Sequence, residues 1–396
     1  MSFRVYMYPA GVAGMALYSY KLGNALAEQG ILVTQFVEDK YELERLPAKF
    51  FKERVLSGRY AGTNSNQRPA WRMLSIFGAY CYNAYRFYSG VKKDCPEVVH
   101  LQSFLFYPVE WYLINRLKAR DCKIVLTVHN IVPYKFYCHR LRRLELAILG
   151  YIYNGADKLI VHSEMNKRQL LANFEVDKAK VLVIPHGEYG LGDICGDISV
   201  REARVRLNLR RNSRVILFFG YIRRIKGLDV LLRAFEQIAG DFPDAVLVIA
   251  GSPSEGESFG PYRDIMAGME YGDRVMCFVE YIRTEDIPLF FLSTDIVVLP
   301  YTEFSAQSGV LHMAQGFGKA VITSDVGGLP EANEKDKTGI IVPAGDVKSL
   351  ADAMHCLLAN EDMRTRMGNR ARELAAETFS WNAIARSTME KAYLQT

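Results

Sequence analysis

The sequence predicts an α/β protein built from two doubly wound, Rossmann-like domains that face a cleft. Three observations support this prediction. The chain has 396 residues, which is more than one hydrophobic core usually supports. Short apolar strands alternate with helices, as in parallel sheets that are covered on both faces. The alternation is interrupted by a polar, glycine-bearing stretch at 188–199 and then starts again.

The first half of the chain supplies one run of this alternation. Its strands are expected at 3–8, 31–37, 97–102, 123–129, 158–163 and 181–187. Its helices are expected at about 16–29, 107–119, 139–153 and 164–174. Because strand–helix–strand crossovers are right-handed, this order predicts a parallel sheet. We assign residues 1–190 to the first domain and residues 191–212 to a linker.

The second half repeats the pattern. Its strands are expected at 214–222, 245–251, 275–279, 294–300, 320–324 and 339–343. A helix follows from Leu228, and three helices end the chain. We assign residues 213–378 to the second domain and residues 379–396 to a terminal helix.

Composition limits the class of protein. The chain is 49% hydrophobic and 23% charged, as expected of an ordinary globular protein. Seven scattered cysteines include no C-x-x-C pair, which favours a reducing compartment and argues against a structural zinc site. We see no signal peptide and no apolar run of ~18 residues. These features predict a cytoplasmic protein, and no Walker motif or D-x-D triplet indicates a bound cofactor or metal.

Positive charge is concentrated in one segment. Residues 45–93 hold ten Lys or Arg residues against one acid, Glu53, and also hold ten aromatic residues. Such a segment suits the surface of an anionic membrane, where cations meet headgroups and rings lie at the interface. It equally fits a solvated helix pair with core aromatics. Nucleic-acid binding is the weakest alternative, because no nucleic-acid motif accompanies the charge.

Ligands of doubly wound sheets bind beyond the carboxyl ends of the strands, so the residues there are candidates for the site. Gly11 and Gly14 follow the first strand and fit either a phosphate approach or a plain tight turn. His129 and Asn130 end another strand, where a histidine is either a packed residue or part of a site. His186 ends the last strand of this half, where a role at a hinge or cleft floor is expected.

The stretch "FFGYIRRIKGLDVLL" (218–232) carries a stronger signal. A strand ends at Gly220, and Arg223 and Lys226 follow in a basic loop before a helix. Arg and Lys suit phosphate oxygens, and a helix amino terminus favours anions. The alternative is a solvated basic loop.

The stretch "LPYTEFSAQSGVL" (299–311) places small polar residues where a helix should begin. Gly309 leaves room for a ligand, and we expect the backbone amides of Ser308, Gly309, Val310 and Leu311 to point at one. Glu303 is an acceptor placed for sugar hydroxyls. Together, 223–226 and 308–311 predict a pocket for a nucleotide diphosphate.

With these motifs, the sequence resembles a retaining glycosyltransferase of the family-four type with GT-B fold. The resemblance rests on "GYIRRIKGLDVLL", "TDIVVLPY…SGVL…GFGKAVITSDVGGLPE", "VLTVHNIVP", "VIPHG" and "FSW". It implies that the first domain is on the acceptor side and that the last helix crosses back onto it. The family's second motif Glu is replaced here by Met313, and its Arg after the strand-end Gly is replaced by Tyr221.

The resemblance also implies roles for individual residues. Arg223 and Lys226 would hold the donor diphosphate opposite the amides of 308–311, with the glycines at 11 and 14 approaching from the first domain. Ile282 and Arg283 would contact the base. His129 and Asn130 would lie on the acceptor side. The catalytic residues that the resemblance implies are His129, Arg223, Lys226 and Glu303.

The predicted reaction moves a hexose from a UDP- or GDP-sugar, with retention, to a glycan or a polyprenyl-diphosphate-linked saccharide, in the synthesis of cell-surface polysaccharide or glycoconjugate. The acceptor would wait at the cytoplasmic leaflet, where the segment 45–93 would dock. Two alternatives remain: a GT-B nucleotide-sugar epimerase, and a non-catalytic nucleotide-sugar-binding partner.

Overall fold

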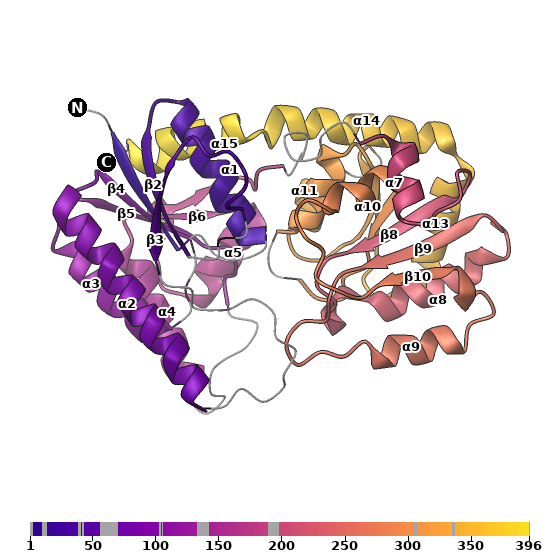
Figure 1. Cartoon of the computed structure of the whole chain (residues 1–396), viewed down its shortest axis with the longest axis horizontal. Helices are drawn as coiled ribbons and strands as arrows, with labels where there is room; N and C mark the ends of the chain where they lie inside the picture. Colours follow the sequence, from indigo (N-terminus) through magenta and orange to yellow (C-terminus); the bar gives the residue numbers. More distant parts are fainter. Residues whose placement is uncertain are drawn as a thin grey trace. The chain divides into compact units, whose positions relative to one another are not determined.

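We analysed a computed structural model of the chain. It describes residues 3–9, 14–38, 41, 43–55, 70–102, 104, 106–132, 142–188, 198–304, 307–334 and 337–395, with the side chains of 70–73 excepted. The chain forms two compact units (Figure 1). The first unit comprises Met1–Gly187 and Trp381–Thr396, and the second comprises Glu188–Ser380. Both are Rossmann-like α/β units, as the sequence predicted.

The first unit is built on a seven-stranded parallel sheet with the order β3-β2-β1-β4-β5-β6-β7. Its strands are β1 (Arg4–Tyr8), β2 (Leu32–Glu38), β3 (Phe51–Val55), β4 (Val98–Leu101), β5 (Lys123–Thr127), β6 (Lys158–Val161) and β7 (Val181–Val183). Its helices are α1 (Gly14–Glu28), α2 (Ala70–Asp94), α3 (Tyr107–Lys118), α4 (Arg142–Gly155), α5 (Glu164–Asn173) and α15 (Trp381–Thr388), with short turns at Lys178–Lys180 and Met389–Tyr393.

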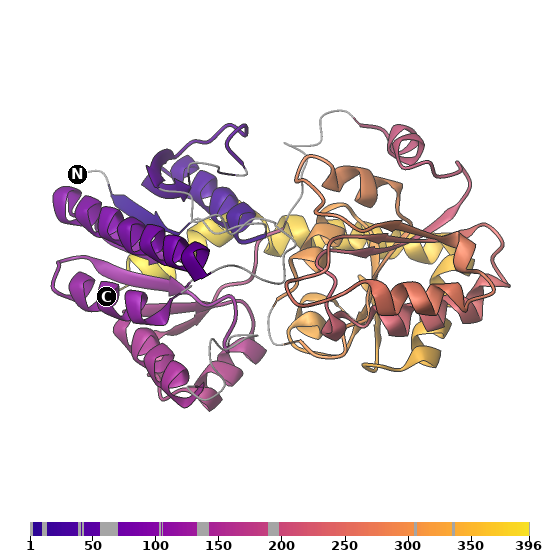
Figure 2. The ribbon, with the colours of Figure 1, turned by 60° about the horizontal axis from the view of Figure 1, so that its bottom comes forward.

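Two layers of helices cover this sheet. Helices α2, α3, α4 and α5 pack on one face through a core that includes Phe87, Ile114 and Leu170 (Figure 2). Helices α1 and α15 contact each other, and the turn Met389–Tyr393 contacts β5 and β6. Burial on both faces explains why strands such as β4 and β6 are almost wholly apolar.

Strand β3 was not expected from the sequence. It reads FKERV and lies at the edge of the sheet, where it pairs with β2. An edge strand has one open side, so charged side chains are tolerated and help to prevent pairing with other chains. The continuous apolar run that identifies a strand buried on both faces is therefore absent.

The second unit holds a six-stranded parallel sheet with the order β10-β9-β8-β11-β12-β13. Its strands are β8 (Arg214–Phe219), β9 (Ala245–Ala250), β10 (Val275–Phe278), β11 (Ile296–Leu299), β12 (Ala320–Ser324) and β13 (Gly339–Val342). Its helices are α7 (Val200–Arg206), α8 (Leu228–Ala239), α9 (Gly260–Ala267), α10 (Ile287–Ser293), α11 (Gly309–Gly316), α12 (Leu329–Ala332), α13 (Val347–Ala359) and α14 (Glu361–Thr378), with short turns at Arg224–Lys226 and Gly272–Arg274.

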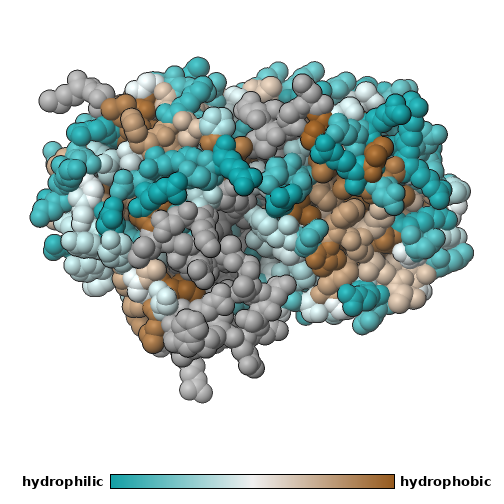
Figure 3. Space-filling view, viewed as in Figure 1, coloured by the Kyte–Doolittle hydropathy of each residue, from teal (hydrophilic) through white to brown (hydrophobic). Residues whose placement is uncertain are grey.

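Side chains alternate between the two faces of this sheet. Ile216 and Phe218 of β8 join the core formed with α8 and α13. Phe219 points the other way and packs, with tilted rings, against Phe290 and Phe291 of α10. In the view of Figure 3, apolar residues gather on the surface over the β9–β10 edge of the sheet, where Cys277 is exposed.

The expected linker at 191–212 needs a correction from residue 200 onward. Helix α7 lies there and packs on α10 within the second unit. Ser199 caps it by accepting from the Glu202 amide at 3.1 Å, the S-x-x-E pattern of a capping box. Arg204 of this helix forms a 3.1 Å ion pair with Asp295, so this part of the chain is bound to the domain it precedes.

Candidate active site

The candidate donor site lies where the strand order of the second sheet reverses. Strands β8 and β11 are neighbours, although their carboxyl ends are separated in the chain by the whole of β9 and β10. Gly220 follows β8, and Tyr301 follows β11 one residue after Pro300. Ligands of doubly wound sheets bind at such a switch point. Both phosphate-binding stretches predicted from the sequence start here.

The basic loop lies directly against the end of β11. Gly227 has a left-handed conformation (φ +65°), and a Cβ at this position would lie 1.9 Å from the carbonyl oxygen of Pro300. Only glycine fits, for both reasons. The amide of Thr302 donates to the Ile225 carbonyl at 2.9 Å and ties the two segments together. The loop is therefore packed against its neighbour and differs from a free solvated loop.

Lys226 connects the two stretches. Its Nζ donates to the Tyr301 hydroxyl at 2.5 Å and lies 4.0 Å from the centroid of the Tyr301 ring. The same hydroxyl is 3.2 Å from Oγ of Ser308. Burial, and secondly the charge of Arg223, lower the pKa of Lys226 to about 7. Because this lysine titrates near neutral pH, an anion bound beside it would favour the protonated, positively charged form.

The start of α11 offers backbone donors beside Ser308. Ser308 is the N-cap but makes no capping bond with its side chain, because its hydroxyl faces Tyr301. A Cβ on Gly220 would lie 3.4 Å from Val310, so the end of β8 adjoins this helix start. One correction is needed: the Leu311 amide already donates to the Ser308 carbonyl at 3.0 Å. The amides of Ser308, Gly309 and Val310 donate to no backbone carbonyl within the described parts of the chain.

The remaining candidates of the second unit differ in how well they are placed. Nε of Arg223 donates to Ser254 Oγ at 2.7 Å, which orients the guanidinium beside Lys226. Glu303 is exposed, two residues after Tyr301. Arg283 is exposed and forms ion pairs with Glu285 and Asp286, so any contact with a base requires that these pairs rearrange.

Two further positions bear on recognition of the nucleotide. Ile282, the other base candidate, is half-buried. Met313 is 7% exposed and belongs to the buried side of α11. It therefore contributes apolar packing at the position where the family carries its second Glu.

In the first unit, candidates also follow the strand ends. His129 lies just after β5 and contacts the Tyr18 ring with centroids 4.8 Å apart. Asn130 beside it is exposed. Gly14 opens α1, and a Cβ there would meet nothing within 4 Å, so the protein itself does not require glycine. Gly11 lies outside the described residues.

His186 and Gly187 fill the end of β7. Nδ1 of His186 is 2.8 Å from the Gly187 carbonyl, and a Cβ on Gly187 would lie 2.4 Å from the Trp381 ring. This end of β7 is therefore closely packed against α15, and the hinge or cleft-floor role expected of His186 stays a prediction.

Three residues of these sites were not anticipated from the sequence. Tyr301 was passed over because it reads as the end of an apolar strand. His162 sits in "LIVHS" and reads as a strand residue. Gln102 follows β4 and is 1% exposed, and neither atom of its amide has a partner among the described residues. For His162 and Gln102, the available signal in the sequence was a polar residue directly after a buried strand.

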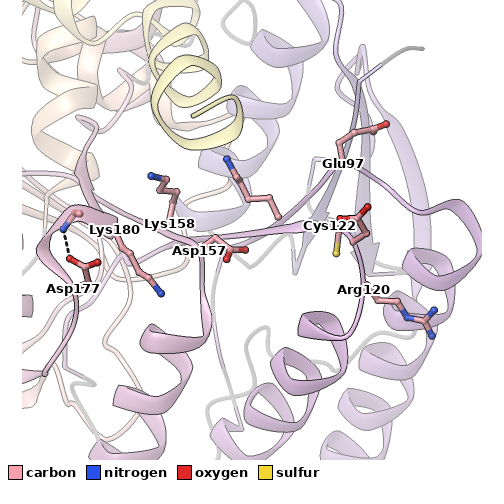
Figure 4. A pocket seen from close by; sticks show the side chains of 10 residues that line it. Glu97, Arg120, Cys122, Asp157, Lys158, Asp177 and Lys180 are labelled. Carbon is pink, nitrogen blue, oxygen red and sulfur yellow. Dashed lines mark hydrogen bonds between the residues drawn. The ribbon is translucent and has the colours of Figure 1, made fainter. Parts of the chain in front are cut away.

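A charged groove lies at the amino ends of strands of the first sheet (Figure 4). It has a volume of about 600 Å³ and is lined by four cations and four carboxylates. Its charges serve structural contacts: Asp157 accepts from the Ile124 amide at 2.7 Å, and Lys123 donates to the Tyr393 carbonyl at 3.0 Å. The groove is at the amino ends of β5, β6 and β7, away from the strand ends that carry the candidate site.

Two features bear on the predicted absence of metal and of a membrane span. Among the described residues, no group of three His, Cys, Asp or Glu side chains is placed to hold a metal ion. Within the same ranges, every helix is too short or too polar to cross a membrane.

The fold and the switch-point site define a GT-B glycosyltransferase. Comparison with protein families agrees: residues 12–187 match the model of Glycosyltransferase Family 4, and residues 199–374 match that of Glycosyl transferases group 1. The chain therefore belongs to the family-four type of GT-B glycosyltransferases, as the sequence motifs indicated. It is an enzyme that transfers a sugar from a nucleotide-sugar donor.

Individual relatives place this assignment in context. The chain is 26% identical over 395 residues to the D-inositol 3-phosphate glycosyltransferase of Corynebacterium aurimucosum, covering 96% of this chain and 90% of the relative. Its fold is similar to the sucrose-phosphate synthase of Thermosynechococcus elongatus (TM-score 0.73, 22% identity, 98% of both chains). It is also similar to HepE of Anabaena in complex with UDP and glucose (TM-score 0.76, 15% identity, 100% of both chains).

Proposed function

We propose that the protein is a retaining hexosyltransferase whose donor is a UDP- or GDP-sugar held at the switch point of the second unit. The observation that supports this most is the chain of contacts Lys226–Tyr301–Ser308. It brings Lys226, whose pKa is lowered, and the N-cap residue of α11 to one place. A diphosphate there would meet Lys226 and Arg223 on one side and backbone N–H groups on the other.

This arrangement suits the chemistry of glycosyl transfer. When the anomeric C–O bond breaks, negative charge develops on the departing diphosphate. Preorganised cations and amides stabilise that charge more strongly than they stabilise the ground state, which lowers the barrier. Loss of one such donor typically costs about 10²–10³-fold in rate. Glu303 is proposed to bind hydroxyls of the sugar and His129 to lie at the transferred sugar and the acceptor.

The donor can be identified by ligand-induced stabilisation. Thermal unfolding is measured with UDP, GDP, ADP and UDP-glucose, for the wild type, Lys226→Ala and Arg224→Ala. At ~100 Kd the correct nucleotide adds about 2.7 kcal/mol of stability. Arg224 is an exposed cation of the same loop, so its variant should keep the shift that Lys226→Ala loses. Equal shifts in both variants, or no shift with any nucleotide, would contradict the proposed site.

We further propose a glycan or a polyprenyl-diphosphate-linked saccharide as the acceptor, reached from the cytoplasmic face of a membrane. The support comes from α2. Its buried side includes Ile76, Tyr80 and Phe87. Its outer side exposes a second apolar stripe at helical spacing, consisting of Leu74, Phe77, Tyr82 and Tyr85. Exposed Lys92 and Lys93 lie in the last turn of the helix, which ends at Asp94, and anionic headgroups would attract the two lysines.

The structure also reduces the charge available for this docking. Among the described residues of the segment 45–93, cations are in ion pairs at three places: Lys49 with Glu28, Arg54 with Glu44, and Arg86 with Glu53. Sedimentation with vesicles of neutral and of anionic lipid tests the surface, with Tyr85→Ser compared with Tyr221→Ser, an exposed tyrosine of the second unit. Equal binding by both variants, or none by the wild type, would argue against it.

A second acceptor class is favoured by the relatives. The matched corynebacterial protein bears the name D-inositol 3-phosphate glycosyltransferase and aligns over nearly the whole chain. An inositol phosphate is therefore the first soluble acceptor to test. Product analysis by NMR reports the linkage and the anomeric configuration. Without acceptor, the same experiment would reveal an epimerised nucleotide sugar, the outcome that the epimerase alternative requires.

A further inference from the structure

Three histidines stand side by side at the carboxyl ends of neighbouring strands of the first sheet. His129 follows β5, His162 follows β6, and His186 lies beyond β7. The rings of His129 and His162 are 5.1 Å apart between centroids, as are those of His162 and His186. Tyr18 of α1 covers the first two rings at 4.8 and 5.4 Å. These contacts all lie within the first unit.

The hydrogen bonds of this row determine where the protons lie. Nδ1 of His162 is 3.0 Å from the backbone carbonyl of Ile184. A carbonyl oxygen only accepts, so this nitrogen carries the proton. Burial lowers the pKa of His162 to about 4, so its ring is neutral near pH 7 and has no second N–H. Nε2 of His162 is therefore an acceptor.

The same reasoning extends to His129. Its Nδ1 is 3.3 Å from Nε2 of His162. Because that atom is an acceptor, Nδ1 of His129 must donate. Burial, and secondly His162, hold the pKa of His129 well below its usual range. The ring is therefore neutral, and its Nε2 carries a lone pair and no proton.

Nε2 of His129 is buried and has no hydrogen-bond partner among the described residues. A buried acceptor without a partner is rare in a folded protein, and it marks a place where a donor from a ligand fits. An unprotonated ring nitrogen repels a phosphate oxygen, which is also an acceptor. A hydroxyl group of a sugar or polyol, in contrast, can donate a hydrogen bond to this nitrogen.

We propose that His162 is a positioning residue that holds His129 in the Nδ1–H form, so that Nε2 of His129 accepts a hydrogen bond from a hydroxyl of the transferred sugar or of the acceptor. The Ile184 carbonyl accepts from Nδ1 of His162 and thereby determines which nitrogen of each ring carries the proton. This inference rests on the proposed function for the identity of the ligand. The protonation pattern itself is a property of the free protein.

The primary test needs no substrate. The full-length chain is labelled with ¹⁵N-histidine, and the long-range ¹⁵N–¹H spectrum distinguishes protonated from bare ring nitrogens. The signals of His129 are assigned by their loss in His129→Gln. We expect a bare Nε2 and a protonated Nδ1 at His129. A protonated Nε2 in the wild type would overturn the proposal, whether or not the enzyme transfers a sugar.

Two substitutions test the positioning role. His162→Phe removes the acceptor for Nδ1 of His129 and should shift the His129 proton to Nε2. His162→Gln retains an oxygen that can accept and should restore the wild-type pattern. An unchanged His129 spectrum in folded His162→Phe would refute the role of His162. If His162→Phe does not fold, the spectrum of the wild type still decides the proposal.

Activity gives a separate readout. With UDP-glucose or another donor found by thermal shift, sugar transfer by His162→Phe should fall tenfold or more and recover in His162→Gln. Stabilisation by UDP should persist in both variants, because Lys226 belongs to the second unit. Absence of transfer by the wild type itself would count against the proposed function and leave the protonation result standing. Unchanged sugar transfer in His162→Phe would contradict the positioning role of His162.

Discussion

Lys226 allows a quantitative prediction on pH. Its pKa in the free protein is about 7, whereas an adjacent diphosphate would favour the charged form and raise that pKa. Binding therefore takes up a proton, so affinity is full below pH 7 and is lost as the pH rises through 7. Between about pH 6 and pH 8 the protonated fraction falls about tenfold, which corresponds to ~1.4 kcal/mol of binding free energy.

The assay is isothermal titration calorimetry with UDP-glucose, whose diphosphate diester does not titrate in this range. The wild type should bind about tenfold more weakly at pH 8 than at pH 6. Proton uptake is checked by repeating the titration in buffers of different ionisation enthalpy. Lys226→Arg is the control, because a guanidinium stays charged throughout and should flatten the profile. A flat profile in the wild type, or the same slope in Lys226→Arg, would show that the charge of Lys226 does not control nucleotide binding.

The remaining predictions concern stability and the site. Because the pKa of Lys226 is lowered from 10.5, the unfolded chain binds more protons than the folded chain between about pH 7 and 10.5, so the stability of the wild type rises with pH in this range. Lys226→Met should therefore raise the melting temperature at pH 7, and a difference in melting temperature from the wild type that grew at high pH would contradict this. Tyr301→Phe removes the hydroxyl between Lys226 and Ser308 and should weaken UDP binding tenfold or so by calorimetry at an unchanged fold; unaltered affinity would show that the link is dispensable. Gly227→Ala should destabilise the protein by at least ~1 kcal/mol more than Gly30→Ala in urea unfolding, since both have positive φ but only Gly227 meets a carbonyl oxygen. Sugar transfer should survive EDTA, measured against the same reaction with added Mg²⁺; complete loss on chelation would show that the reaction requires a metal ion.

Much of the candidate site could be read from local sequence. Arg223, Lys226 and the helix start at Gly309 were identified because each follows an apolar strand and combines positive charge or small residues with a helix amino terminus. The distinct character of Lys226 could not be read this way. Its depressed pKa results from burial beside Tyr301 and Arg223, and burial depends on which other strand ends nearby.

The errors have a common cause. Leu311 was counted as a free donor, but the first turn of α11 closes on Ser308 and uses that amide. Residues 200–206 were assigned to a linker, although their contact with α10 and the Arg204–Asp295 pair make them part of the second unit. The charge of 45–93 was counted without its partners Glu28 and Glu44. In each case a contact decided the outcome, and local composition does not report contacts.

The class of fold and the strand ends where chemistry could lie follow from local sequence, because apolar periodicity, glycine and charge act over a few residues and are visible in any short window. Which strand ends are neighbours depends on the folded sheet and cannot be read from local sequence. Strand pairing follows from burial of the whole sheet, and it brings Lys226 to Tyr301 and His162 to His129 across long stretches of chain. The position of the proton on His129 and the charge of Lys226 follow from these contacts, because the tautomer of a histidine and the pKa of a lysine depend on the groups that replace water around the side chain.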